Sequence, residues 1–149
     1  MNLLQACSPN IVSVQRSTTI IDVARLMHEH HVGAVVVVDE GAPPRPVGIV
    51  TDRDIVLRVV ALAQQRIITV AEQVMSTEPV MVPESMDTRE ALQLMRERGV
   101  RRLLVTGEER VLKGIVSFDD LVAVVADDVG SMAQIIATGL LREEKRRGP

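Results

Sequence analysis

Two short segments of this chain carry a hydroxyl side chain and a carboxylate three residues apart, directly after an apolar run. Residues 48–54 read Gly-Ile-Val-Thr-Asp-Arg-Asp, and residues 114–120 read Gly-Ile-Val-Ser-Phe-Asp-Asp. Where a strand ends and a helix begins, such a pair caps the helix, because the hydroxyl accepts from a free backbone amide. The same helix start has partial positive charge that suits a phosphate, and an ionised Asp there can accept hydrogen bonds from ribose hydroxyls. One copy of the pattern does not distinguish helix capping from nucleotide binding.

The pattern occurs twice because the chain is an internal duplication. The copies start 114 − 48 = 66 positions apart, and residues 32–38 align with 100–106 at a separation of 68, since the first repeat contains a longer loop. Self-similarity at a fixed period indicates repeated structural units. Each repeat is close to the length at which folding hides only about 60% of the chain's surface, so we expect the two halves to share a core.

Apolar residues at helical spacing predict the first helix of each repeat, over residues 17–31 and 89–99. Capping patterns mark both starts: Thr19-x-x-Asp22 and Asp87-x-x-Glu90. Aliphatic and β-branched runs predict four buried strands, at 35–38, 47–51, 103–105 and 112–117. Each repeated pattern opens a second helix, expected over 52–65 and 118–126. The segments that lead into the two repeats also match, with Ser8, Val12 and Val14 opposite Ser76, Val80 and Val82. With one further strand at the entry of each repeat, the order of elements is β-α-β-β-α twice, in an α/β fold.

The rest of the chain connects and extends the repeats. We expect one repeat over residues 1–66, a linker over 67–75, the other repeat over 76–127, and a C-terminal helix with a charged tail over 128–149. Thr69-x-x-Glu72 is expected to cap a short linker helix, and Ser131-x-x-Gln134 to cap the last helix. The last helix carries an apolar stripe outside both repeats, so packing against its own chain and contact with a partner both remain open.

Composition argues against several classes of protein. The net charge of −3 offers no general attraction to nucleic acid, and Phe118 is the only aromatic residue, so base-stacking platforms are lacking. Cys7 is the only cysteine, which excludes an intramolecular disulfide, and no apolar run approaches the ~20 residues of a membrane span. The basic and apolar regions of a secretory signal are not found at the start, so we expect a cytoplasmic protein.

Motifs for catalysis and metal binding are missing from the sequence. It contains no Walker loop, no Gly-x-Gly-x-x-Gly and no His-Glu-x-x-His pattern. His28, His30 and His31 lie near a helix end, where histidines interact with the helix dipole, and no second Cys/His cluster accompanies them. We therefore expect neither an enzyme nor a metal-binding protein.

Two β-α-β-β-α units with Gly-Ile-Val-[Thr/Ser]-x-x-Asp at the last strand-to-helix junction resemble a pair of CBS (cystathionine beta-synthase) domains, over residues 8–127. The resemblance implies a stand-alone regulatory module with pseudo-twofold symmetry, which senses and does not catalyse. It implies two clefts that bind adenosine-containing ligands such as AMP, ADP or ATP, and less often NAD or S-adenosylmethionine, as regulatory ligands with no cofactor required. Each cleft would take apolar residues from one repeat and the Thr/Ser-x-x-Asp element from the other.

Carried over to this sequence, the resemblance assigns residues to each cleft. One cleft would combine Asp120 as the ribose ligand with Val12, Val32, Ile115 and Ser117, and with Arg101 and Arg102 facing the phosphate. The other would combine Asp54 as the ribose ligand with Val80, Val100, Ile49 and Thr51, and with Arg53 as the nearby cation. The cleft with two arginines should bind anions more tightly, although a solvated basic surface is the alternative for this pair.

The resemblance also implies a homodimer, formed largely through the helices that follow Thr51 and Ser117. The chief alternative is a module with vestigial clefts that dimerises or docks onto an unknown regulated protein through its last helix. Direct nucleic-acid binding through residues 96–102 or 142–147 is a weaker alternative, because no base-reading element accompanies the charge. The nucleotide, the number of occupied clefts and the regulated pathway stay open.

Overall fold

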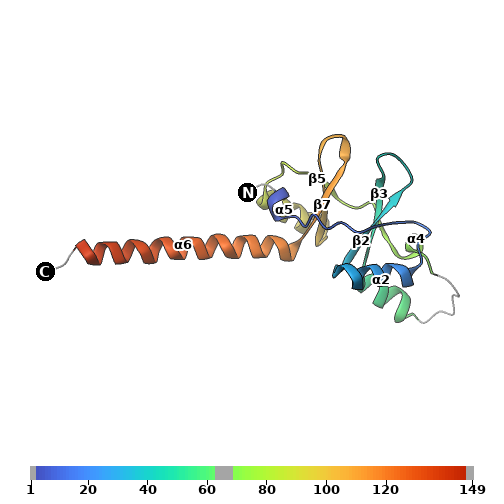
Figure 1. Ribbon diagram of the computed structural model, residues 1–149, viewed down its shortest axis with the longest axis horizontal. Helices are drawn as coiled ribbons and strands as arrows, with labels where there is room; N and C mark the ends of the chain where they lie inside the picture. Colours follow the sequence, from blue (N-terminus) through green and yellow to red (C-terminus); the bar gives the residue numbers. More distant parts are fainter. Residues whose placement is uncertain (1–2, 63–68, 147–149) are drawn as a thin grey trace.

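The computed structural model describes residues 3–62 and 69–146 and has the α/β fold that the sequence predicts. Each repeat builds one sheet, whose first strand lies parallel to the second while the second runs antiparallel to the third. The first sheet has the order β1 (Ser13–Gln15), β2 (Ala34–Asp39), β3 (Arg45–Thr51) and β4 (Ser76–Thr77). The second sheet has the order β5 (Met81–Pro83), β6 (Arg102–Thr106) and β7 (Leu112–Ser117). The two sheets together form the body of the molecule (Figure 1).

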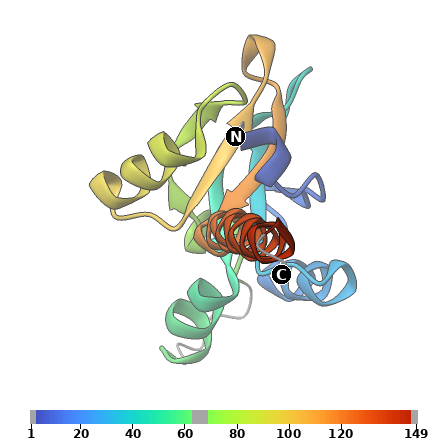
Figure 2. The ribbon, with the colours of Figure 1, turned by 90° about the vertical axis from the view of Figure 1, so that its left-hand side faces the viewer.

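The helices differ greatly in length. The two amphipathic helices are α2 (Ile20–His30) and α5 (Thr88–Arg98). The short elements are α1 (Leu3–Ala6), α3 (Asp52–Ile55) with a π-helical turn (Val56–Val60), α4 (Ala71–Val74) and a 3₁₀ turn (Glu108–Arg110). The longest is α6 (Phe118–Arg146), which projects far beyond the body (Figure 1) and is seen nearly end-on in Figure 2.

α2 and α5 begin at the predicted caps. The Thr19 hydroxyl accepts from the Asp22 amide at 3.2 Å, and the Glu90 carboxylate accepts from the Asp87 amide at 3.2 Å. These bonds satisfy amides that the first turn of a helix leaves without partners. The paired sequence patterns therefore produce paired helices.

Both helices end in a residue with left-handed backbone. This residue is His31 in the first repeat, with φ 53°, and Gly99 in the second, with φ 64°. Left-handed backbone is unfavourable for a residue with a Cβ and costs glycine nothing comparable. The same helix ending is therefore less strained in the second repeat.

Each repeat has its own apolar core, and a third cluster joins the two. The first core includes Val23 and Val50, and the second includes Leu103 and Val116, all fully buried. The joining cluster is centred on Val36, Ile49 and Leu104, from β2, β3 and β6. The two halves therefore share apolar contacts along the line where their sheets meet, and each is otherwise packed around its own residues.

The short helices α1 and α4 exchange places between the repeats. α1 precedes the first repeat, but Leu3 is buried in the second core and its amide donates to the Met86 carbonyl at 3.1 Å. α4 precedes the second repeat, but Ala71 is buried in the first core and its amide donates to the Thr18 carbonyl at 2.8 Å. Each core is thus completed by the segment that leads into the other repeat, which ties the halves together.

Two predicted helix starts are wrong. α6 runs without a break through residues 127–131, so Ser131 lies inside a helix that begins at Phe118 and does not cap a separate one. Residues 118–146 contain no proline, and an interior glycine such as Gly130 costs a helix only about 1 kcal/mol. α4 is capped at Val70, whose amide donates to the Gln73 side chain at 3.0 Å, and not at Thr69.

The helix predicted over 52–65 takes a different form. It consists of α3 and the π-helical turn, followed by a turn at residues 61–62, and residues 63–65 lie outside the described residues. The Arg58 guanidinium in the π-helical turn donates to the Val74 carbonyl at 2.9 Å. This bond fixes the segment against the end of α4.

Candidate functional site

The first repeated pattern forms the junction between β3 and α3. Thr51 Oγ1 accepts from the Asp54 amide at 3.1 Å, and Asp54 Oδ2 accepts from the Thr51 amide at 3.0 Å, so both bonds of a capping box are made. The other carboxylate oxygen, Asp54 Oδ1, lies 3.7 Å from Arg58 Nε. The Asp54 side chain is 18% exposed, which leaves part of the carboxylate accessible beside a helix start.

A cavity of about 200 Å³ lies beside this junction, between the two repeats, and we call it the Asp54 cleft. Its lining joins Ile49, Thr51 and Asp54 of the first repeat to Val80 and Val100 of the second, which is the combination implied by the family resemblance. The lining also includes Ser76, Thr77, Glu78, Pro79, Arg101 and Arg102. Pockets for complete small ligands enclose about 300–1,000 Å³. The cavity therefore has room for part of a nucleotide, and the remainder must extend past its rim.

The two arginines lie in the Asp54 cleft, whereas the sequence-based assignment paired them with Asp120. They line this cleft because Arg101 and Arg102 directly follow Val100 at the start of β6, and this stretch lines the cleft as a unit. The arginines bring two positive charges to a cavity that already contains Asp54. The expected difference in anion affinity between the clefts therefore favours the Asp54 cleft.

Arg53 does not occupy the predicted position beside the cleft lining. It is not among the described residues that line the Asp54 cleft, and its amide donates to Asp52 Oδ1 at 2.8 Å. The cation next to Asp54 is Arg58, one helical turn further on. The prediction failed because neighbouring positions on a helix point in different directions, and residues four apart share a face.

Residues 76–79 form a wall of the cleft that the sequence assignment did not include. β4 pairs with β3, so that Ser76 lies opposite Ile49 and Thr77 opposite Gly48. Glu78 adopts left-handed backbone with φ 54° between β4 and Pro79. The available signal was the alignment of the two lead-in segments, in which Ser8 falls opposite Ser76.

The glycine of each repeated pattern has a steric cause. A Cβ on Gly48 would lie 2.5 Å from Met75 Sδ, and a Cβ on Gly114 would lie 2.5 Å from Cys7 Sγ and 3.1 Å from the Ser8 carbonyl oxygen. Such distances are below van der Waals contact. The segment that leads into each repeat therefore crosses β3 or β7 at a position that has no side chain. The glycines let the lead-in segments reach the two junctions.

The second repeated pattern forms an equivalent junction between β7 and α6. Asp120 Oδ2 accepts from the Ser117 amide at 2.7 Å and from the Ser117 hydroxyl at 2.6 Å. The lead-in residue Ser8 pairs with Ile115 of β7, and its amide donates to the Ile115 carbonyl at 3.0 Å. Burial is the main cause that raises the pKa of the nearby Cys7 thiol, and the Asp120 carboxylate raises it further.

Two further residues of the predicted Asp120 cleft, Val12 and Val32, are partly buried against the first core. Ile115 packs against the cluster that joins the repeats. The repeat symmetry brings Ser117 and Asp120 to a position equivalent to Thr51 and Asp54. Their grouping with Val12 and Val32 as a second ligand cleft remains a prediction.

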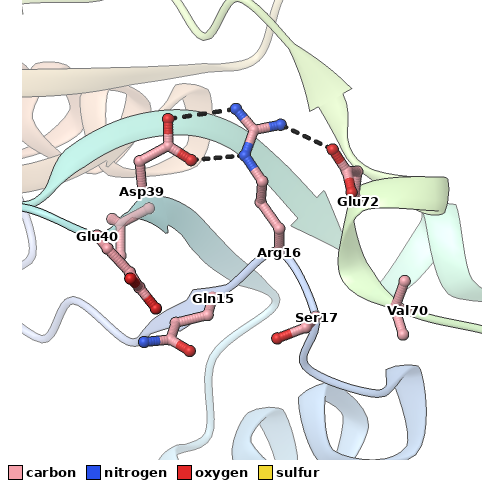
Figure 3. A pocket seen from close by; sticks show the side chains of 8 residues that line it. Gln15, Arg16, Ser17, Asp39, Glu40, Val70 and Glu72 are labelled. Carbon is pink, nitrogen blue, oxygen red and sulfur yellow. Dashed lines mark hydrogen bonds and ion pairs between the residues drawn. The ribbon is translucent and has the colours of Figure 1, made fainter.

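A larger cavity, of about 570 Å³, lies where the first repeat meets α4, and ion pairs join residues that line it (Figure 3). Arg16 donates to both carboxylate oxygens of Asp39, and its Nη1 lies 3.0 Å from Glu72 Oε1. Arg16 lowers the pKa of the Asp39 carboxyl, and Asp39 raises the pKa of the Arg16 guanidinium. The Arg16 side chain is thereby satisfied within the protein and ties the end of β2 to α4.

No group of three or more His, Cys, Asp or Glu side chains that could hold a metal ion occurs within residues 3–62 and 69–146. The three histidines predicted to lie near a helix end do so, with His31 forming the C-cap of α2. The Asp54 cleft is therefore the candidate site, and the described residues contain no candidate metal centre.

α6 exposes a continuous apolar face. Its exposed large apolar residues include a series at alternating steps of four and three: Phe118, Val122, Val125, Val129, Met132 and Ile136. By length and composition alone, one described helix, Phe118–Arg142, could cross a membrane, and 6% of its most apolar window is buried. The sequence analysis expected no apolar run of this length, and it did not recognise this helix, which contains Asp127 and Asp128.

Comparison with known proteins gives a consistent result. The family model for the CBS domain matches residues 4–61 and 70–127. The chain is 39% identical to the CBS domain-containing protein YhcV of Bacillus subtilis over 111 residues, covering 74% of this chain and 76% of that protein. It is 34% identical to an uncharacterized protein, MK0525, of Methanopyrus kandleri over 115 residues, which is 77% of this chain and 58% of that protein's length.

Solved structures agree with these matches. A putative signal-transduction protein with CBS domains from Burkholderia ambifaria superposes with a TM-score of 0.71 at 33% identity, covering 84% of this chain and 92% of the other. The CBS domain of a bacterial CNNM/CorC family Mg²⁺ transporter, solved in complex with ATP, superposes with a TM-score of 0.68 at 25% identity, covering 82% of this chain and 84% of the other. Two tandem units of one family therefore account for most of the chain.

Proposed function

The chain belongs to the CBS-domain family as a tandem pair, a regulatory module, and we propose that it senses an adenine nucleotide in the Asp54 cleft. The observation that carries the proposal is the composition of that cleft, where a capped helix start, an accessible carboxylate, aliphatic walls and two arginines meet. A related CBS domain was solved in complex with ATP, which supports this ligand class. We further propose that the protein acts in the cytoplasm, requires no cofactor and is not an enzyme.

Each part of a nucleotide has a candidate partner in the cleft. Asp54 would accept hydrogen bonds from the ribose hydroxyls, as an acceptor-only carboxylate does. Val80, Val100 and Ile49 would enclose the base, since the single aromatic residue, Phe118, is not in the lining. Arg101 and Arg102 would bind the phosphate, through charge-assisted hydrogen bonds.

The test is a thermal-shift series with AMP, ADP, ATP, NAD and S-adenosylmethionine, with GMP as the matched control for base identity. A ligand at 100 times its dissociation constant adds about 2.7 kcal/mol of stability and raises the melting temperature measurably. The chain contains no Trp or Tyr and the single Phe absorbs weakly, so a strong absorbance maximum at ~260 nm in the purified protein would come from a bound base. Extraction and mass spectrometry would identify that molecule, and a flat series with no copurifying nucleotide would reject the proposal.

A second function is favoured by the exposed face of α6: assembly with a second copy of the chain. The alternating steps of four and three place the exposed apolar residues on one seam, which is the pattern of a coiled coil. A parallel pair would set Asp127 and Asp128 beside the same residues of the copy. An antiparallel pair instead brings the acidic first half of one helix to Arg142 of the other, so charge favours the antiparallel arrangement.

The competing occupant of this face is a lipid bilayer. Asp127 and Asp128 lie near the middle of the apolar stretch, and an aspartate at the centre of a membrane span costs about 2.5–3.5 kcal/mol. Light scattering tests the proposal: Val129→Asp should convert a dimer to a monomer, while Gln134→Asp on the polar face should not. A monomeric wild type, or one that floats with liposomes, would contradict assembly through α6.

A further inference from the structure

Arg101 connects the first turn of α6 to the Asp54 cleft. The Phe118 amide donates to the Arg101 carbonyl at 2.9 Å, the Arg101 guanidinium lies 5.2 Å from the centre of the Phe118 ring, and Arg101 Nη2 lies 3.3 Å from Asp119 Oδ1. Arg101 also lines the Asp54 cleft. One side chain therefore belongs both to the candidate phosphate site and to the start of the projecting helix.

The first repeat lacks the side-chain part of this connection. The Asp52 amide donates to the Gly33 carbonyl at 3.1 Å, which repeats the backbone bond between Phe118 and Arg101. Gly33 has no side chain to contact the helix that follows, and that helix, α3, ends at Ile55. The connection is thus found where the long exposed helix begins, and its short counterpart has the backbone bond alone.

The ion pair between Arg101 and Asp119 is suited to exchange. The two side chains are 69% and 81% exposed, and pairs with such exposure are weakly held and screened by salt. A phosphate group carries more charge than a carboxylate and offers several acceptor oxygens to a guanidinium. Asp119 is therefore a competitor that a bound phosphate can displace from Arg101.

We propose that Asp119 and Phe118 are positioning residues for Arg101, and that a nucleotide phosphate in the cleft releases Arg101 from Asp119 and loosens the first turn of α6. The inference rests on the proposed nucleotide function of the Asp54 cleft. This coupling would let the sensor report on its ligand, because occupancy of the cleft changes the first turn of α6, the helix whose exposed face assembles with a second copy. By linkage, anything that binds α6 and favours one state of this turn changes nucleotide affinity by the same factor.

The experiment uses the full chain, with AMP as the probe, and measures affinity by calorimetry and local opening by hydrogen exchange with mass spectrometry. In Asp119→Asn the competing carboxylate is lost, so AMP should bind about twofold to fivefold more tightly, the range expected for an exposed ion pair. Glu29→Gln, which neutralises an exposed carboxylate on α2, should leave the affinity unchanged. A purely structural role for Asp119 would not tighten binding.

The exchange measurement tests the coupling itself. AMP should speed exchange of amides in the first turn of α6 in the wild type and leave it unchanged in Asp119→Asn, where the turn is already released. If AMP binds the wild type but neither the affinity nor the exchange depends on Asp119, the coupling is refuted and the proposed nucleotide function stands. If AMP and the other adenine nucleotides do not bind the wild type, both proposals fail.

Discussion

The two strand-to-helix junctions have nearly the same capping geometry and very different surroundings. At the first, Thr51 and Asp54 start a helix of four residues followed by a π-helical turn, and Asp54 lies beside Arg58. At the second, Ser117 and Asp120 start a helix of 29 residues, and the position equivalent to Arg58 is occupied by Val124. A local motif thus fixes the start of a helix, while the residues around it decide what the junction can bind.

The same contrast extends to the partner repeat. The first junction faces Arg101 and Arg102, whereas the equivalent positions toward the second junction are Gly33 and Ala34. The duplication has therefore kept the scaffold while the two junctions differ, the first with the anion site that we propose and the second at the start of a projecting helix. The following predictions test this division, beginning with the largest expected effect.

Removing the charge of Asp54 should weaken nucleotide binding more than removing that of Asp120. If both clefts bind, a nucleotide titration has a tighter and a weaker phase, and we assign the tighter phase to the Asp54 cleft. A hydrogen bond to a charged group contributes about 1.5–3 kcal/mol, so Asp54→Asn should lower the affinity of the tighter phase roughly tenfold to a hundredfold. Asp120→Asn should leave that phase within about twofold. Calorimetric titration measures both, and loss of the tighter phase in Asp120→Asn would reverse the assignment of the clefts.

The two pattern glycines should differ in their tolerance of a methyl group. Gly114→Ala should cost about 2–3 kcal/mol of unfolding free energy, because the new Cβ would meet the Ser8 backbone carbonyl as well as Cys7. Gly48→Ala should cost less, because it meets the flexible Met75 side chain, and adding Met75→Ala should relieve part of that cost. Urea denaturation measures the unfolding free energy of each variant. Equal losses for Gly48→Ala and Gly114→Ala would contradict the expected difference.

The endings of α2 and α5 should respond in opposite directions. His31→Gly should stabilise the protein by about 1 kcal/mol, because it relieves left-handed backbone at a residue with a Cβ. Gly99→Ala should destabilise it by a similar amount, since no atom lies within 4 Å of the added Cβ and only the backbone conformation is affected. Thermal unfolding compares the two, and a destabilising His31→Gly would point to a contact of the His31 side chain.

The smallest effect concerns the ion pairs of the first repeat. Arg16 lowers the folded-state pKa of Asp39, so this carboxylate contributes stability that is present above its unfolded pKa of about 3.9 and is lost as the pH falls through the folded value. The position equivalent to Asp39 in the second repeat is Gly107, which has no ionisable side chain and so makes no pH-dependent contribution to stability. Asp39→Asn should therefore lower the urea midpoint slightly at pH ~7 and not at pH ~2; an equal change at both would exclude the charge as its cause.

Much of the fold followed from pattern alone. Caps, helical spacing and aliphatic runs located α2, α5 and the strands β2, β3, β6 and β7, because these signals act over a few residues. The break predicted between residues 126 and 131 was wrong, since capping residues inside a proline-free helix do not end it. Five residues that the sequence analysis grouped together line the Asp54 cleft, and Arg101 and Arg102, which it grouped with Asp120, line the same cleft.

By itself, the sequence determined the duplication, the two capped junctions and the glycine in each, because these depend on local backbone chemistry. Only the tertiary structure decided that α1 and α4 complete the opposite cores, that Arg101 and Arg102 line the Asp54 cleft, and that α6 projects beyond the body after its first turns. These features depend on which segments meet across the two repeats. Near-identical patterns have the same local preferences, so their different roles arise from contacts between residues far apart in the chain.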